Sequence, residues 1–224
     1  MIDNHKALTV GKYIEILKIA ELGGEPLERN EEIVSILSGK TVKELDMMPL
    51  EDYSVLCKRA SFLTAEPRPV PARKTYKCGR FTLCPTLDYK KLTTAQYIDF
   101  QTLTRAQEGP VPPYVEILSC LLVPEGCKYC DGYDVADVHA AIRDDLSVED
   151  AASLYHFFMA RLVKSMRRSL TSLKGALKAK DRTATEAIRE KMREATALLS
   201  DGAGWQTWTP FQRLPALLGM TSGE

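Results

Sequence analysis

The sequence predicts a mainly α protein made of two related helical units, with a small β-hairpin in the linker and a long C-terminal helix. Three observations predict this fold: a pattern that occurs twice, a break in helical periodicity between the two copies, and a long apolar seam after the second. The segment LTVGKYIEI starting at Leu8 returns as LTTAQYIDF starting at Leu92, an offset of 84 residues (92 − 8). EIVSIL from Glu32 returns as EILSCL from Glu116 at the same offset.

A third match shows where the second copy is longer. Leu50-Glu51-Asp52 corresponds to Val148-Glu149-Asp150 at an offset of 98, so the second copy has gained 14 residues (98 − 84). The insertion contains Cys127 and Cys130. Because a shared helical stripe buries the same face in each copy, we expect Tyr13 and Ile14 to occupy positions equivalent to those of Tyr97 and Ile98.

The first unit, residues 1–65, is predicted to contain three helices. Residues 8–22 form an amphipathic helix with Thr9 as its N-cap, and Gly23-Gly24 ends it. A short helix follows at about 30–38 and stops at Gly39. Pro49 opens the third helix, whose apolar side carries Leu50, Tyr53, Leu56, Cys57, Ala60 and Leu63.

The linker, residues 66–91, breaks the helical pattern. Pro67, Pro69 and Pro71 exclude a helix and predict an extended segment. Residues 74–83 then place β-forming side chains around Gly79, which predicts a small β-hairpin.

The second unit, residues 92–200, is predicted to hold helices at about 93–107, 113–122 and 134–143, a long helix capped by Ser147, and a further helix at 183–200. Thr93 and Gln96 have capping-box spacing. The long helix carries an apolar seam of Leu154, Phe158, Leu162, Met166, Leu170, Leu173 and Leu177. We expect the first four of these side chains to be buried, because an exposed seam of this length would aggregate.

Composition narrows the class of protein. Thirty basic residues balance thirty acidic ones, so net charge gives no support for nucleic acid or an anionic membrane as a general partner. No apolar run approaches the roughly 18 residues that span a bilayer, and the first residues lack the pattern of a signal peptide. These features predict a cytosolic protein with reduced cysteines.

Four cysteines form the one motif with potential chemistry. Cys127-x-x-Cys130 together with Cys78 and Cys84 supplies enough thiolates for a structural zinc site. However, five residues separate Cys78 from Cys84, more than the usual two to four. We therefore favour unligated cysteines, with zinc as the alternative and redox chemistry as a third reading.

No catalytic residue, cofactor-binding residue or cofactor is predicted. His5, His139 and His156 are the only histidines, and none has a visible partner for nucleophilic or metal chemistry. The acids Asp144-Asp145 and Glu149-Asp150 flank a helix start, where carboxylates favour the helix macrodipole. Nucleotide-binding and nucleophile-elbow motifs are missing. The sequence therefore predicts a protein that is not an enzyme.

Residues 161–182 form a basic stretch opposite the apolar seam. It contains one acid, Asp181, against Arg161, Lys164, Arg167, Arg168, Lys174, Lys178, Lys180 and Arg182. The default interpretation is a solvated helix face. The alternatives are that this basic stretch binds a partner with an acidic surface or binds nucleic acid.

The tail, residues 201–224, is too apolar for a solvated linker. Gly202 and Gly204 break the preceding helix, and Pro210 and Pro215 prevent a long new one. Its apolar side chains are predicted to pack on the chain's own helices or to bind a partner, with Trp205, Trp208, Phe211 and Leu214 as the partner-binding residues.

The order of these segments resembles the tail assembly chaperones and related small assembly proteins of tailed bacteriophages. The resemblance covers most of residues 8–175. It rests on the opening Leu8 to Glu15, the block Ile33 to Gly39, the phrase Met48 to Asp52, the hairpin leading into Leu92 to Phe100, and Phe157-Phe158 ahead of the basic helix.

The resemblance implies a non-enzymatic protein of the host cytoplasm that holds an amphipathic client, such as a tape-measure protein, in an apolar groove between helices. The expected partner is a phage tail or other virion protein, without nucleic acid or membrane, and homo-oligomerisation stays open. One alternative is a stoichiometric structural component of a virion or particle. A second alternative is a nucleic-acid-binding module that uses the basic helix 161–182.

Overall fold

The computed structural model describes residues 1–21, 25–105 and 113–178, and within this part the chain is mostly helical with one small sheet. Its elements begin with α1 (Val10–Glu21), α2 (Pro26–Ser38), α3 (Val42–Asp46) and α4 (Leu50–Ala60), followed by the 3-10 turn η1 (Ser61–Thr64). The strands β1 (Tyr76–Cys78) and β2 (Phe81–Pro85), the 3-10 turn η2 (Tyr89–Lys91), α5 (Thr94–Arg105), α6 (Tyr114–Leu121) and β3 (Leu122–Pro124) come next. The described part ends with α7 (Val135–Asp145) and α8 (Val148–Lys178).

The predicted mainly α character and the hairpin are confirmed. Strands β1 and β2 pair antiparallel, with Tyr76 opposite Leu83 and Cys78 opposite Phe81, and Gly79 turns between them with φ +53°. A third strand, β3, pairs with β2 through Cys84 and Val123. The sequence did not indicate β3, because its three apolar residues continue the pattern of the preceding helix.

The positions at which several helices start are explained by N-cap residues whose side chains bond backbone N–H groups of the first turn. Thr93 accepts from the backbone N–H of Gln96 at 3.2 Å, and the Gln96 side chain accepts from the Thr93 N–H at 2.9 Å, which is the predicted capping box. Ser147 accepts from the Asp150 N–H at 3.1 Å and so caps α8 as predicted. Helix α2 starts four residues earlier than predicted, since Pro26 occupies its first turn. The helix predicted at 183–200 lies outside the described residues.

The two copies share an order of helices, and α2 and α6 bury equivalent residues, namely Ile33 and Ile117, Val34 and Leu118, and Leu37 and Leu121. Helices α1 and α5 differ in most of the face that they bury. Helices α1 and α5 start and end at the same 84-residue offset, and the starts of α4 and α8 correspond at the 98-residue offset. Yet Tyr13 is 1% exposed, whereas Tyr97 is 38% and Ile98 is 54% exposed. The expectation that Tyr13 and Ile14 occupy positions equivalent to those of Tyr97 and Ile98 is therefore wrong. Helix α5 packs through Phe100, the counterpart of the buried Ile16, and through Gln96, whose counterpart Lys12 is exposed on α1.

Helices α1, α7 and α8 surround the main core. This hydrophobic cluster contains Tyr13 from α1, Cys78 from β1, Val138 from α7 and Leu154 from α8. It therefore draws on residues from both predicted units. A second cluster contains Phe100, Ile117, Tyr155, Phe158 and Leu162. Leu154, Phe158 and Leu162 are buried as predicted, and the side chain of Met166 lies outside the described residues.

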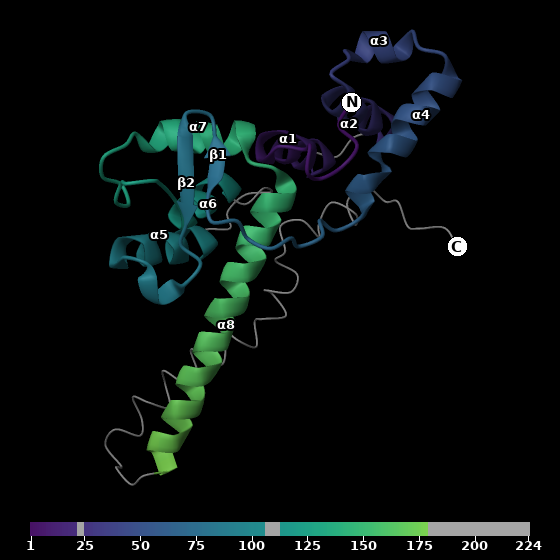
Figure 1. Cartoon of the computed structure of the whole chain (residues 1–224). Helices are drawn as coiled ribbons and strands as arrows, with labels where there is room; N and C mark the ends of the chain where they lie inside the picture. Colours follow the sequence, from purple (N-terminus) through teal and green to yellow (C-terminus); the bar gives the residue numbers. More distant parts are fainter. Residues whose placement is uncertain (22–24, 106–112, 179–224) are drawn as a thin grey trace.

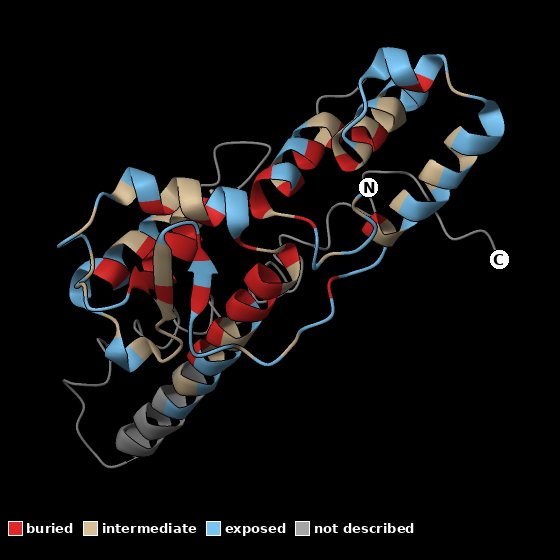
Figure 2. Ribbon diagram, turned by 45° about the horizontal axis from the view of Figure 1, so that its top comes forward, coloured by how far each residue is buried: buried red, intermediate tan, exposed pale blue. Residues whose placement is uncertain are grey.

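Helices α3 and α4 form an arm that extends from the body built by α5 to α8, as Figure 1 shows. Helix α4 has no buried residue, and its half-buried side faces α2 with Tyr53 and Leu56. In Figure 2 the arm is coloured mostly exposed or intermediate, whereas the start of α8 is mostly buried. The chain thus combines a packed body with a thinly packed arm.

Candidate functional site

The four cysteines of the zinc alternative lie on three different segments. Cys78 is buried on β1 within the main core, and Cys84 is half-buried on β2. Cys127 and Cys130 lie in the loop after β3, where the Cys127 thiol contacts the Gly132 carbonyl at 3.6 Å. Across residues 1–21, 25–105 and 113–178, no three His, Cys, Asp or Glu side chains gather closely enough to hold a metal ion.

Burial keeps the thiols of Cys78 and of Cys120, a further buried cysteine on α6, protonated. It raises the pKa of the Cys78 thiol to about 11, with the Asp145 and Asp150 carboxylates adding to the effect. Burial likewise raises the pKa of Cys120 to about 11. A thiolate is the nucleophile and the metal ligand, so these two cysteines are poorly suited to either role.

The histidines are separated and have structural neighbours. The His139 ring nitrogen Nε2 lies 2.9 Å from the Ser119 hydroxyl, and His5 packs edge-on against Phe62. Burial lowers the pKa of His5. His156 packs against Phe157. None of these arrangements joins a histidine to a nucleophile and an orienting carboxylate.

The paired acids also have structural roles. Asp150 is 3.4 Å from Arg73 and accepts a hydrogen bond from the Ser147 hydroxyl at 3.0 Å. Asp144 pairs with Arg143 at 2.8 Å, and this hydrogen bond lowers the pKa of the Asp144 carboxyl. Asp150 therefore joins the start of α8 to the linker, and Asp144 pairs with its neighbour on the surface of α7.

The arm carries an exposed apolar surface at its tip, which the sequence analysis missed. Met47 is 88% exposed and Leu50 is 81% exposed, on either side of the turn between α3 and α4. We name this the arm-tip surface and define it by Met47 and Leu50, together with Val42 at the start of α3, all of them exposed. The sequence places Leu50 on the apolar side of its helix, whereas the half-buried part of that side begins at Tyr53.

The arm tip is held by a short helix with its own cap. Thr41 and Glu44 form a capping box in which the Thr41 N–H donates to the Glu44 carboxylate at 2.7 Å. That contact lowers the pKa of Glu44. Leu45 is buried and anchors α3 on the arm. The spacing Thr41-x-x-Glu44 is a sequence signal from which α3 was predictable.

Exposed acids border the arm-tip surface. They come from α3 and from the first turn of α4, and they are Glu44, Asp46, Glu51 and Asp52. Lys40 and Lys43 are exposed in the same segment, which leaves a net charge of −2 (2 − 4). An apolar surface with an acidic border is complementary to a helix that has an apolar face and basic flanks. The arm tip is therefore the best candidate for a protein-binding surface in the described part of the chain.

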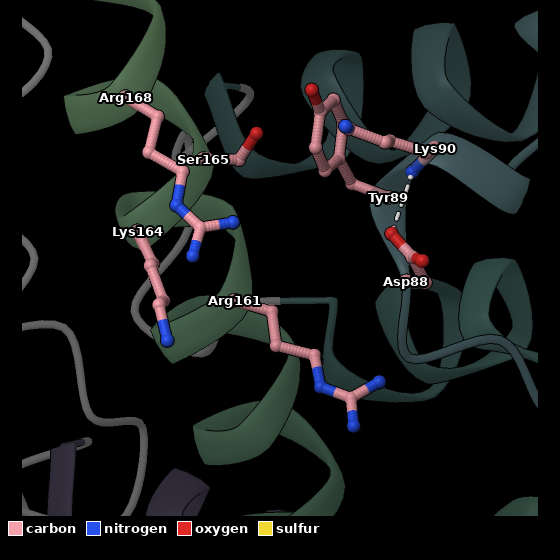
Figure 3. Close-up of a pocket in the computed structure, with 7 residues that line it drawn as sticks. All are labelled: Asp88, Tyr89, Lys90, Arg161, Lys164, Ser165 and Arg168. Carbon is pink, nitrogen blue, oxygen red and sulfur yellow. Dashed lines mark hydrogen bonds between the residues drawn. The ribbon is translucent and has the colours of Figure 1, made fainter. Parts of the chain in front are cut away.

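The basic helix contributes to a pocket between α8 and η2. Arg161, Lys164 and Arg168 are exposed on α8, and the pocket of about 450 Å³ also includes Ser165, Asp88, Tyr89 and Lys90 (Figure 3). The side chains of Arg167, Lys174 and Lys178 lie outside the described residues, as do Lys180 and Arg182. The cations of α8 are neighbours in the sequence, whereas Lys90 precedes Arg161 by 71 residues (161 − 90) and has no pattern that links it to them.

The predicted partner-binding residues Trp205, Trp208, Phe211 and Leu214 also lie outside the described residues. Within the described helices, none has both the length and the apolar character needed to cross a membrane.

Fold and surfaces together define a mainly α protein with an acidic-bordered apolar arm and a basic pocket. Comparison with protein-family models, curated proteins and solved structures finds no match to this chain.

Proposed function

We propose that this protein is a non-enzymatic assembly protein that binds an amphipathic helix of a client through its arm-tip surface. The client class follows from the resemblance to tailed-bacteriophage tail assembly chaperones: a tape-measure protein or another tail component. The place of action is then the host cytoplasm. The observation that carries the proposal is the exposure of Met47 and Leu50, at 88% and 81%, between the two helices of the arm, α3 and α4.

Exposing two large apolar side chains has a cost that a client would remove. Burying a side chain of this size is worth about 1.5–3 kcal/mol. Methionine also adapts to differently shaped partners, which suits a surface that holds an incompletely folded client. The acidic border selects clients with basic flanks and sets their orientation.

The test is co-expression of the full chain with a candidate tape-measure client, followed by affinity capture. We expect the double variant Met47→Ser/Leu50→Ser to lose most of the client, because the substitutions remove the apolar contact without touching the core. Leu27→Ser is the matched control, since Leu27 is 64% exposed but lies in the first turn of α2, outside the arm-tip surface. Equal capture by the double variant and the control would exclude the arm tip as the binding surface.

The alternative, a stoichiometric structural component of a virion or particle, makes a different prediction. Mass spectrometry of purified particles would find the protein in stoichiometric amounts, whereas a chaperone is missing from them. A chain lacking residues 202–224 extends the test to Trp205 and the other tail residues. If that chain folds normally but loses the client, the tail contributes to client binding.

A further inference from the structure

The pocket between η2 and α8 has walls that are fixed by the protein core. On one side, Tyr89 packs against the second hydrophobic cluster. On the other, Phe158 and Leu162 bury one face of α8 in the same cluster, and Arg161 and Lys164 are exposed on other faces of that helix. Because both walls pack on the same cluster, the pocket is formed before any ligand arrives.

Its charge is strongly unbalanced. Lys90, Arg161, Lys164 and Arg168 face one acid, Asp88, which leaves a net charge of +3 (4 − 1) among the lining residues. The Asp88 carboxylate is already engaged, since it accepts from the backbone N–H of Lys90 at 3.1 Å and caps η2 (Figure 3). Within the described residues, none of the four cations forms an ion pair with a carboxylate. Like charges concentrated in a hollow focus an electrostatic field that attracts anions.

We propose that this pocket binds a phosphate-bearing ligand with at least two phosphate groups. The lining offers two guanidinium groups, two ammonium groups and the hydroxyls of Ser165 and Tyr89, nearly all of them donors. A ligand that satisfies them must supply many acceptor oxygens; a terminal phosphate supplies three that are not shared with a neighbouring group, and an internal phosphate or phosphodiester supplies two. Arginine matches phosphate by paired hydrogen bonds, which favours this group over isolated small anions.

The spacing of the cations sets the ligand's length. Arg161 and Arg168 are seven residues apart on one helix, which is roughly 10 Å along its axis. A chain of two or three phosphates spans this distance without either arginine bending toward the other, whereas a single phosphate requires both to converge. A volume of about 450 Å³ is within the range of small-ligand pockets. The phosphates can belong to a free oligophosphate or to the backbone of a single-stranded nucleic acid.

This inference is independent of the client-binding proposal, because the pocket lies on α8 and η2 whereas the arm tip lies on α3 and α4 (Figure 1). Either proposal can fail while the other holds. The ligand-binding experiment below therefore uses the full chain without any client.

Titration calorimetry with tripolyphosphate tests the pocket directly. We expect saturable binding to the wild-type chain, and a dissociation constant raised by about tenfold or more in Arg161→Gln/Lys164→Gln. Lys90→Gln changes the opposite wall and should also weaken binding. The matched control is Lys12→Gln/Lys18→Gln, which removes two exposed cations from α1. Thermal unfolding of each variant, with and without tripolyphosphate, gives a second measurement, because a ligand that binds the folded state raises Tm.

Two further probes separate the ligand classes. If a short oligothymidylate binds more tightly than tripolyphosphate, with affinity that falls steeply as salt rises, the source is a nucleic-acid backbone. If tripolyphosphate binds more tightly, the source is a free oligophosphate. Three results overturn the proposal: no saturable binding of either probe, equal loss in the α1 control, or tighter binding of an aspartate-rich peptide than of both phosphate probes.

Discussion

Gly11 on α1 lies directly against Arg143 on α7, and a Cβ atom at Gly11 would be 2.9 Å from the Arg143 carbonyl oxygen and 2.8 Å from its Cγ. The arginine side chain can move, but the backbone carbonyl of a helix cannot without disturbing α7. The two helices can therefore approach this closely only with glycine at this position. Position 95, the counterpart of Gly11 in the second copy, holds an exposed alanine on a face that α5 leaves open.

Gly11→Ala should accordingly destabilise the protein by about 1–3 kcal/mol, the range for overpacked contacts. In most exposed helix positions the same substitution would stabilise. Urea unfolding followed by circular dichroism measures the change, with Lys12→Ala as the control at the neighbouring exposed position. A Gly11→Ala variant as stable as the wild type would show that α1 and α7 separate easily.

Phe158 anchors α8 in the second cluster. It is 1% exposed, and its ring packs edge-on against Phe100 with centroids 4.9 Å apart. Phe158→Ala should cost about 3–5 kcal/mol of unfolding free energy. A double-mutant cycle with Phe100→Ala should give a coupling of about 0.5–1.5 kcal/mol, as expected for an aromatic pair. Phe157→Ala, at a half-buried neighbour, is the control and should cost less.

Cysteine accessibility separates the unligated state from the zinc alternative. Cys130 is exposed, whereas Cys78 and Cys120 are buried. With iodoacetamide at mildly alkaline pH, Cys130 should be alkylated first, and Cys78 and Cys120 only after unfolding. Peptide mass spectrometry reads out the order. Protection of Cys130 that a chelator removes would instead favour bound zinc.

Alkaline pH should destabilise the fold through Cys78. The folded state holds the pKa of this thiol at about 11, above its ordinary value of 9.0. Between pH 9 and 11 the unfolded chain therefore releases a proton that the folded protein retains, so stability falls as pH rises. The loss from this group is at most about 1.4 kcal/mol per pH unit.

Cys78→Ala removes this titration. Its unfolding free energy should lie below that of the wild type near neutral pH, and the gap should narrow as pH rises from 9 to 11. Chemical unfolding at a series of pH values measures the gap, with Cys130→Ala as a parallel variant at an exposed thiol. A constant gap across that interval would rule out the buried thiol as a source of alkaline sensitivity.

Local patterns were sufficient to predict most elements of the fold. Gly79 between β-forming residues predicts the hairpin, and Ser147 predicts the start of α8, because both signals act over a few residues. Strand β3 was missed because Leu122–Pro124 becomes a strand only by pairing with β2. The repeat predicts the order of helices and the face that α2 and α6 bury. It does not predict the face that α5 buries, because that face depends on neighbours elsewhere in the sequence, as Tyr13 and Tyr97 demonstrate.

The surfaces were less predictable for the same reason. Periodicity assigns Leu50 to the packed side of its helix, and only the position of α2 determines that this side begins at Tyr53. The pocket combines Lys90 with Arg161, and no local pattern indicates that residues so far apart in sequence share a cavity. In contrast, the cations on α8 were identified from composition alone.

The contact between Thr9 and Ser147 affects how the protein can fold during synthesis. The two residues form an antiparallel bridge in which the Val10 N–H donates to the Leu146 carbonyl at 2.9 Å and the Val148 N–H donates to the Leu8 carbonyl at 2.8 Å. The bridge closes a loop of 138 residues (147 − 9). On the ribosome, the Leu8 carbonyl and the Val10 N–H therefore lack these hydrogen-bond partners until the start of α8 has emerged from the exit tunnel. A nascent chain arrested before that point should stay protease-sensitive at its N-terminus, and release of α8 should complete the body in one late step.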